Sequence, residues 1–307
     1  MTPDPSSAGP DGPGASSGER RGMMAMPEYP APAKLNLFLH VVGRRPDGYH
    51  LLQTLFRFLD HGDSVAIDVR PDGAIRLLLP LPGVPPEQDL CWRAARLLQA
   101  HAGCRLGADI RLVKRLPLGG GLGGGSSDAA TVLLALNRLW RLEWPRERLQ
   151  ALGLELGADV PFFIHGRNAF VEGVGERLQA LNLPPAWYLV VAPPASVPTA
   201  EIFAAPDLTR DTKAIKMADF SAGWGAGGLF GRNDLEAVVC ERYPAVARAL
   251  AWLRQHAEAR MTGSGACVFA PFAAEQDARA VLARMPEGMT GWVAQGLDEH
   301  PLRALAD

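Results

Sequence analysis

The feature that most constrains this chain is a glycine-rich segment in its first half. Six of the seven residues from 119 to 125 are glycine, and two serines follow them. Glycine lacks the Cβ atom that keeps a backbone amide away from a ligand. The apolar pattern predicts a strand at residues 109–113 and a helix at residues 126–139. Because a helix start presents free N–H groups and a positive dipole end, the segment predicts a phosphate-binding site.

Two familiar nucleotide-binding patterns and a plain linker fit the glycine run less well. No lysine follows the glycines, so the Walker-type pattern GxxxxGK[ST] is absent. The glycines satisfy the dinucleotide pattern GxGxxG, but the acidic residue expected about 20 positions later, Glu143, does not end a strand. A flexible linker is disfavoured because the serines and Asp128 offer helix-capping oxygens.

The composition points to a small-molecule partner. The chain has 307 residues and a formal net charge of −2, so nothing draws it as a whole to nucleic acid or an acidic membrane. No apolar run approaches the roughly 18 residues of a membrane helix, and the N-terminus lacks the apolar stretch of a secretory signal. We therefore expect a soluble, cytoplasmic protein without nucleic-acid or membrane partners. Its oligomeric state is not indicated.

The cysteines and the first residues of the chain carry no site. The cysteines are too far apart for a metal site, and we expect buried, reduced thiols at Cys91, Cys104, Cys240 and Cys267. In residues 1–28, proline, glycine and serine fill 14 of the 28 positions, which leaves too little apolar surface to offset the ordering entropy. We predict a disordered extension there. A plastid transit peptide is the alternative, which its acidic residues oppose.

The rest of the chain alternates strand-like and helix-like patterns, which is typical of an α/β (α+β) protein, and its length suits two domains. Strands are predicted at 34–42, 55–59, 64–69, 74–79, 109–113, 168–174, 187–191 and 292–295. Helices are predicted at 89–102, 126–139, 146–156 and 275–284, with another from Asn233 that Pro244 breaks and a loop at 220–231.

Two charged residues are candidates for chemistry, each with a plainer alternative. Lys34 begins a predicted strand and shares one strand face with Asn36, since alternate side chains point the same way. Without further evidence, a lysine near the end of a strand is more often a solvated surface charge than a functional group. Asp159 lies among apolar residues, where an unpaired charge is costly, and pairing with Lys34 would offset that cost. Taken alone, Asp159 would cap a turn before Pro161.

Several segments, in order, resemble one family of kinases. The glycine-rich segment resembles the phosphate-binding motif of the galactokinase, homoserine kinase, mevalonate kinase and phosphomevalonate kinase (GHMP) superfamily. Within it, the chain resembles the kinases of a cytidine-diphosphate conjugate of methylerythritol over about residues 29–297. The matching segments are 32–39, 43–50, 117–130, 157–163, 173–176, 198–203, 233–236 and 262–266.

The resemblance implies a fold and an activity. It implies a two-domain GHMP-kinase fold with its active site in the cleft between an N-terminal ATP-binding domain, residues 29–185, and a C-terminal domain, residues 186–307. The reaction is ATP-dependent phosphorylation of a hydroxyl of the erythritol part, in the non-mevalonate route to isoprenoid precursors. A superfamily kinase of another alcohol and a non-catalytic nucleotide-binding regulator stay open as alternatives.

The resemblance also implies the roles of individual residues. Lys34 and Asp159 are the expected catalytic residues, with Asp159 as the base. The expected substrate-binding residues are Asn36, Tyr49, His50, Thr199 and Phe203. ATP is expected at Pro117, Leu118, Gly119, Gly120, Gly121, Leu122, Gly123, Gly124, Gly125, Ser126 and Ser127. Mg²⁺ is implied because it bridges phosphate oxygens in such reactions. Its ligands are undetermined, although the Ser126 or Ser127 hydroxyl could serve. The turn at residues 263–265 lies near the site or is simply a tight hairpin.

Overall fold

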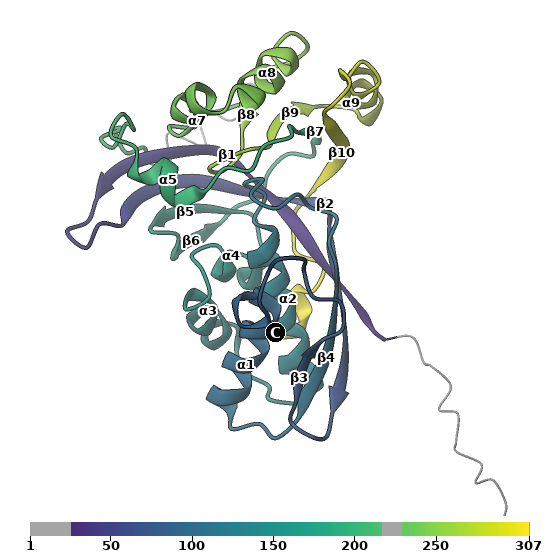
Figure 1. Cartoon of the computed structure of the whole chain (residues 1–307). Coiled ribbons are helices and arrows are strands. Elements are labelled where there is room, and N and C mark those ends of the chain that lie inside the picture. Colours follow the sequence, from purple (N-terminus) through teal and green to yellow (C-terminus); the bar gives the residue numbers. More distant parts are fainter. Residues whose placement is uncertain (1–25, 217–228, 307) are drawn as a thin grey trace, which may run out of the picture.

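The computed structural model of the chain describes residues 26–216 and 229–306 (Figure 1). Most of the predicted extension at 1–28 and most of the predicted loop at 220–231 therefore lie outside the described residues. The first strand begins at Glu28, two residues before the proline-rich start of the ordered pattern, because it pairs with Ala66 of the second strand.

The chain forms strands and helices in mixed order. The strands are β1 (Glu28–Arg44), β2 (His50–Arg70), β3 (Ile75–Leu77), β4 (Gly107–Val113), β5 (Ala169–Gly173), β6 (Arg177–Ala180), β7 (Trp187–Ala192), β8 (Arg260–Met261), β9 (Val268–Phe272) and β10 (Thr290–Leu297). The helices are α1 (Leu90–Ala102), α2 (Gly124–Leu139), α3 (Arg146–Leu154), α4 (Val160–His165), α5 (Thr199–Ala204), α7 (Glu236–Arg242), α8 (Pro244–Leu253) and α9 (Glu275–Leu282), with 3₁₀ turns at Pro86–Gln88 and Arg303–Ala306.

A long antiparallel pair, β1 and β2, runs through both halves of the molecule (Figure 1). The main path of the sheet is β3-β4-β2-β10-β7-β9-β8, with β1 and β5 paired to β2 and β6 paired to β5. β10 joins the halves because it pairs with β2 at one end and with β7 along its length. The division at residue 185 stays a prediction, since this sheet is continuous across it.

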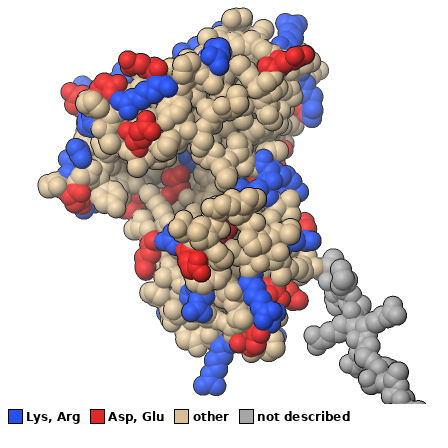
Figure 2. Space-filling model, in the orientation of Figure 1, with Lys and Arg blue, Asp and Glu red and all other residues tan. Residues whose placement is uncertain are grey.

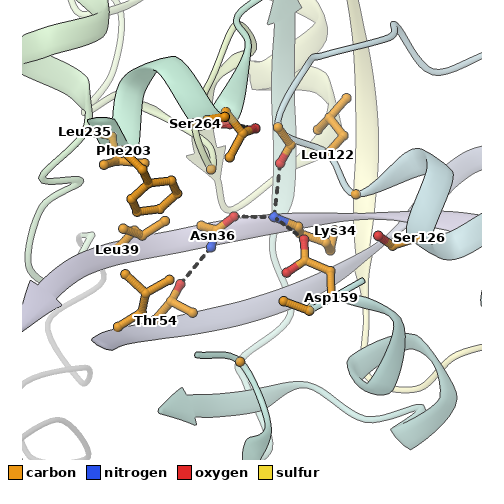
Figure 3. A pocket seen from close by; sticks show the side chains of 18 of the residues that line it. Lys34, Asn36, Leu39, Thr54, Leu122, Ser126, Asp159, Phe203, Leu235 and Ser264 are labelled. Atoms are coloured by element: carbon orange, nitrogen blue, oxygen red, sulfur yellow. Dashed lines mark hydrogen bonds and ion pairs between the residues drawn. The ribbon is translucent and has the colours of Figure 1, made fainter. Parts of the chain in front are cut away.

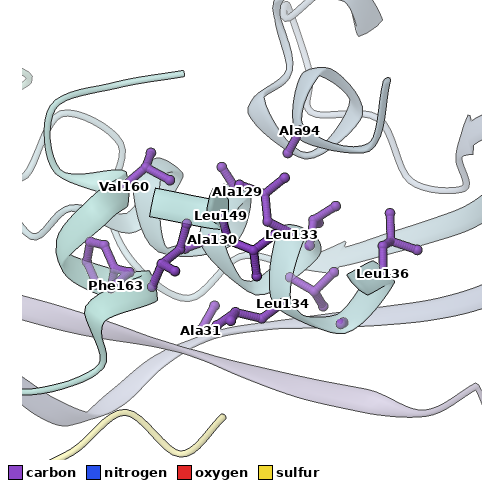
Figure 4. Close-up of a cluster of buried hydrophobic side chains, with 14 of the residues drawn as sticks. Ala31, Ala94, Ala129, Ala130, Leu133, Leu134, Leu136, Leu149, Val160 and Phe163 are labelled. Carbon is purple, nitrogen blue, oxygen red and sulfur yellow. The ribbon is translucent and has the colours of Figure 1, made fainter. Parts of the chain in front are cut away.

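Helices cover the sheet in each half. In the first half, α1 to α4 pack into one cluster of buried apolar side chains, and every residue of α2 from 127 to 137 is buried (Figure 4). Ala306, near the C-terminus, joins this cluster. In the second half, α7, α8 and α9 bury a separate apolar cluster. Because α2 is held on all sides, its N-terminus has a fixed position relative to β1.

Most predicted helices and strands are confirmed with shifted ends, but the separate strands at 55–59 and 64–69 are wrong. They form one strand, β2. Residues 60–63 have a turn-like composition, yet β1 pairs with the last two of them, with Pro32 opposite Gly62 and Ala31 opposite Asp63. A Cβ atom on Gly62 would lie 2.2 Å from the Ala31 carbonyl oxygen, so only glycine allows this close pairing.

Two helices were not predicted, and one predicted helix is two. α4 and α5 have six residues each, too few to show helical periodicity. The break before Pro244 is confirmed, because proline is tolerated in the first turn of α8. The first of the two helices starts at Glu236 instead of Asn233, whose side-chain amide donates to the carbonyls of Met261 and Gly263, at 2.8 Å each.

The cysteine prediction is correct in part. All four thiols are free, and Cys91 and Cys267 are buried. Cys104 and Cys240 are half-buried, because Cys104 follows the end of α1 and Cys240 lies on the short helix α7. Among the described helices, none is long and apolar enough to cross a membrane.

Candidate active site

One cavity of about 880 Å³ lies between the two halves of the molecule, and a hollow is visible on that face in Figure 2. This volume suits a small-molecule substrate. Every predicted site residue except Ser127 lines the cavity. From the first half these are Lys34, Asn36, Tyr49, His50, Asp159 and residues 117–126, and from the second half Thr199 and Phe203. The cavity thus brings together residues from distant parts of the sequence.

The glycine-rich loop is held by the turn at residues 262–265 and by the two residues that follow it. The amide of Ala266 donates to the Gly119 carbonyl at 3.0 Å, and the amide of Cys267 donates to the Gly120 carbonyl at 3.1 Å. Gly121 has φ +73°, and a Cβ atom there would lie 2.2 Å from the Thr262 carbonyl oxygen. Only glycine fits this position. The turn therefore belongs to the site, and it fixes the shape of the loop.

The loop leads directly into the N-terminus of α2. Gly123 precedes the helix in the left-handed conformation and contributes no side-chain cap. The first backbone N–H groups of α2 are therefore free to bind an anion at the cavity wall. Ser126 lines the cavity, whereas Ser127 is fully buried and its hydroxyl donates to the Pro32 carbonyl at 2.7 Å. Only the hydroxyl of Ser126 is left to meet a ligand.

Lys34 lies at the centre of the cavity floor (Figure 3). Its Nζ donates to Oδ1 of Asn36, donates to the Gly121 carbonyl at 3.1 Å and lies 3.5 Å from Oδ2 of Asp159. The other side of the Asn36 amide donates to the Thr54 hydroxyl at 2.9 Å. The prediction that Lys34 and Asn36 share a strand face is confirmed, and Asn36 orients the lysine.

Burial and the neighbouring Asp159 act on the pKa of Lys34 in opposite directions. Only 4% of its side chain is exposed, and desolvation lowers its pKa while the charge and hydrogen bond of Asp159 act in the opposite direction. Asp159 is one-third exposed and stands just before α4. Its side chain makes no capping hydrogen bond with that helix and instead forms an ion pair with the lysine. The pair places a carboxylate that lines the cavity next to the glycine-rich loop.

The other end of the cavity carries aromatic rings. The His50 and Phe203 ring centroids lie 5.0 Å apart at 32°, while Tyr49 is 66% exposed. The hydroxyls of Thr199 and Ser264 lie 2.6 Å apart, which links α5 to the turn under the loop. Two flat faces and a polar edge can hold a planar base.

A buried charged group near the loop was missed from the sequence. Nζ of Lys114 lies 2.5 Å from Oδ2 of Asp63 and 2.9 Å from Oδ2 of Asp128. Asp63 also accepts the amides of Arg115 and Leu116, at 2.6 and 2.9 Å. These bonds fix the chain just before the glycines. Lys114 is one of only four lysines and precedes the motif directly, a signal that could have singled it out.

Within residues 26–216 and 229–306 there is no cluster of three or more histidine, cysteine, aspartate or glutamate side chains able to hold a metal ion. Mg²⁺ often binds through one or two protein oxygens together with substrate phosphates. Ser126 and Asp159 supply such oxygens at the cavity wall.

Comparisons with known proteins agree with this geometry. Two family models match the chain, described as "GHMP kinases N terminal domain" over residues 89–167 and "GHMP kinases C terminal" over residues 221–291. A solved mevalonate kinase shares the fold, with a TM-score of 0.64 at 15% identity over 89% of this chain and 99% of that one. The chain is a GHMP kinase.

Nearer relatives define the family more narrowly. The 4-diphosphocytidyl-2-C-methyl-D-erythritol kinase of Aromatoleum aromaticum is 63% identical over 90% of this chain and 95% of its own. That of Thiobacillus denitrificans is 64% identical over 89% and 96%. A crystal structure of 4-(cytidine 5'-diphospho)-2C-methyl-D-erythritol kinase has 35% identity and a TM-score of 0.76, over 88% of this chain and 98% of that one. The chain belongs to the 4-diphosphocytidyl-2-C-methyl-D-erythritol kinase family.

Proposed function

We propose that this kinase transfers the γ-phosphoryl group of ATP to a hydroxyl of 4-diphosphocytidyl-2-C-methyl-D-erythritol. The observation that carries the proposal is the position of Lys34, whose Nζ contacts both the Gly121 carbonyl of the phosphate loop and the Asp159 carboxylate. A phosphoryl donor bound to the loop and an alcohol bound at the Asp159 carboxylate would then both lie next to the Lys34 ammonium group. The high identity to named relatives supports the choice of substrate.

The roles of the residues follow from phosphoryl-transfer chemistry. Such a reaction needs a cradle for phosphates, positive charge where negative charge develops, and a group that orients or deprotonates the hydroxyl. The loop amides and the start of α2 form the cradle. Asp159 accepts the hydroxyl proton as the new O–P bond forms and the bond to the ADP oxygen breaks. Lys34 holds Asp159 in place and stabilises the charge on the transferred group.

Magnesium, when bound, would supply positive charge that neutralises the phosphates during transfer. Ser126 at the start of α2 and Asp159 across the cavity are the protein oxygens that would hold it. The base end of the cavity, Tyr49, His50 and Phe203, would hold the cytosine, and Thr199 would add a polar contact.

The proposal is tested by a coupled assay of ADP release with four alcohols. We expect turnover with the cytidylated methylerythritol and little with mevalonate, homoserine or galactose at equal concentration. The reason is the base end of the cavity, because none of the other three alcohols has a planar aromatic base to place there. Equal rates with all four alcohols would contradict the proposed substrate but leave the kinase assignment unaffected.

A further inference from the structure

Arg210 lies behind the base end of the cavity and makes four hydrogen bonds. Its Nε donates to Nε2 of His50 at 3.0 Å. Its Nη1 donates to the Leu208 carbonyl at 2.9 Å, and its Nη2 donates to the carbonyls of Phe203 and Ala205, at 3.0 and 2.6 Å. The guanidinium therefore ties His50, the first residue of β2, to the segment around the end of α5. His50 and Arg210 are 160 residues apart in the sequence.

The bond from Arg210 decides which nitrogen of His50 carries hydrogen. A guanidinium has only donors and keeps its charge in proteins. Nε2 of His50 must therefore present its lone pair, and a neutral imidazole then carries its hydrogen on Nδ1. Resting on the proposed function, we propose that Arg210 is a positioning residue that locks His50 as the neutral Nδ1–H tautomer. In that form His50 offers a hydrogen-bond donor to the substrate's pyrimidine.

The surroundings of His50 favour the neutral ring. Burial lowers its pKa, and the positive charges of Arg210 and Arg44 lower it further. Protonation would also place a second N–H against the guanidinium. The charged groups of the turn between β1 and β2 leave this balance in place, because the Asp47 carboxylate pairs with Arg45 at 2.8 Å.

Nδ1 is the ring nitrogen of His50 that the bond from Arg210 leaves available for a ligand in the cavity. His50 lines the cavity together with Tyr49 and Phe203. In the part of the chain that the structure describes, Nδ1 makes no hydrogen bond, whereas Nε2 is occupied by Arg210. Cytosine offers two acceptors on its pairing edge, N3 and O2, and either would accept from Nδ1–H. In the opposite tautomer, with the hydrogen on Nε2, Nδ1 would be an acceptor and could not bond to N3 or O2, which are acceptors too.

Arg210 also fixes the second face of the base end. The carbonyl of Phe203 accepts from its Nη2, and this residue carries the ring next to His50. All four acceptors are uncharged, so the planar fork of the guanidinium, and not a charge pair, sets the arrangement. A lysine could keep the bond to His50 but could not make the other three bonds at once.

The experiment has two independent measurements on the full chain. The first is ¹⁵N NMR of the histidine rings in the wild type without ligand, with the His50 signals assigned by their loss in His50→Gln. We expect Nδ1 protonated and Nε2 unprotonated at neutral pH, and a mixture of tautomers in Arg210→Met. A protonated Nε2 in the wild type would overturn the proposal. This measurement needs no substrate, so it is separate from the test of the proposed function.

The second measurement separates the two KM values. We expect Arg210→Met to raise KM for the cytidylated substrate at least tenfold, with KM for ATP and kcat within about threefold of the wild type. Arg210→Lys should recover part of the loss. The control is Arg242→Met, which removes an arginine that contacts Asp207 and Glu201 on the same segment but not His50. An unchanged KM for the cytidylated substrate, or equal rises in both KM values, would overturn the proposal.

Discussion

The two ends of the cavity are built differently. At the phosphate end, Lys34 and the glycine loop are held by buried hydrogen bonds, and only 4% of the lysine side chain is exposed. At the base end, Tyr49 is 66% exposed, and His50 and Phe203 are held from behind by Arg210. Chemistry requires groups placed before the substrate arrives. A base, in contrast, can complete its own binding site by covering exposed rings. We therefore expect changes to the reacting groups at the first end to lower kcat and changes to its loop to raise KM for ATP. Changes at the second end should raise KM for the cytidylated substrate alone.

The largest effect should follow Asp159→Asn. The asparagine keeps the shape but cannot accept the proton, and general-base catalysis contributes about 10² to 10⁴ in rate. We expect kcat to fall by that factor while thermal unfolding stays near that of the wild type. The control is Asp207→Asn, a surface partner of Arg242, which should keep its full kcat. A kcat near that of the wild type in Asp159→Asn would contradict the role of Asp159 as the general base.

A smaller but still large effect should follow Gly121→Ala. The new Cβ atom would lie 2.2 Å from the Thr262 carbonyl oxygen, so the loop and the turn beneath it must move apart. We expect KM for ATP to rise at least tenfold and Tm to fall. Gly83→Ala is a matched control, because Gly83 has a similar φ of +76° with nothing within 4 Å of the added atom. If both variants behave alike, backbone strain alone accounts for the loss.

Phe203→Ala should act on the base end only. Stacking of a base on an aromatic ring is worth about 1–3 kcal/mol, roughly a 5- to 150-fold change in binding. We expect KM for the cytidylated substrate to rise by such a factor while KM for ATP stays within twofold. Phe272→Ala, a half-buried phenylalanine at the end of β9 outside the cavity lining, is the control. Equal changes in both KM values of Phe203→Ala would indicate a packing role.

The smallest effect should be a pH-dependent gain in stability from Asp128→Asn. Desolvation raises the pKa of Asp128 from 3.8 to about 7, although Lys114 pulls the other way. Since the folded state holds this proton more tightly than the unfolded state, stability contributed by the neutral carboxyl is lost as pH rises from about 4 to above 7. Asparagine stays neutral throughout.

Thermal unfolding at several pH values measures this gain. We expect the Tm of Asp128→Asn to exceed that of the wild type by a few degrees at pH 8 and to match it near pH 4. For a chain of this size, each kcal/mol of unfolding free energy shifts Tm by about 2–4 °C. The exposed Asp68→Asn should show no such trend. A Tm difference that is constant with pH would contradict a raised pKa at Asp128.

The sequence predicted the phosphate end better than the supports behind it. The glycine run and Lys34 are visible because local spacing encodes them: consecutive glycines, and alternate residues on one strand. The group formed by Lys114 and the two aspartates was missed because Asp63 lies 51 residues from the lysine, and only the sheet brings them together. Arg210 was missed for the same reason, since its contact with His50 spans 160 residues. Ser127 was placed in the phosphate site with Ser126, but helix geometry turns it toward Pro32.

A double-mutant cycle with Asp159→Asn and Phe203→Ala tests most directly whether the two ends act separately. The two side chains lie on opposite sides of Lys34 and Asn36 in Figure 3, and their effects should add, as they do for sites without shared partners. We expect the loss of kcat/KM in the double variant to equal the product of the single losses within about twofold to threefold. A departure of tenfold or more would show that base binding and proton transfer are coupled, and would contradict the separation of the two ends.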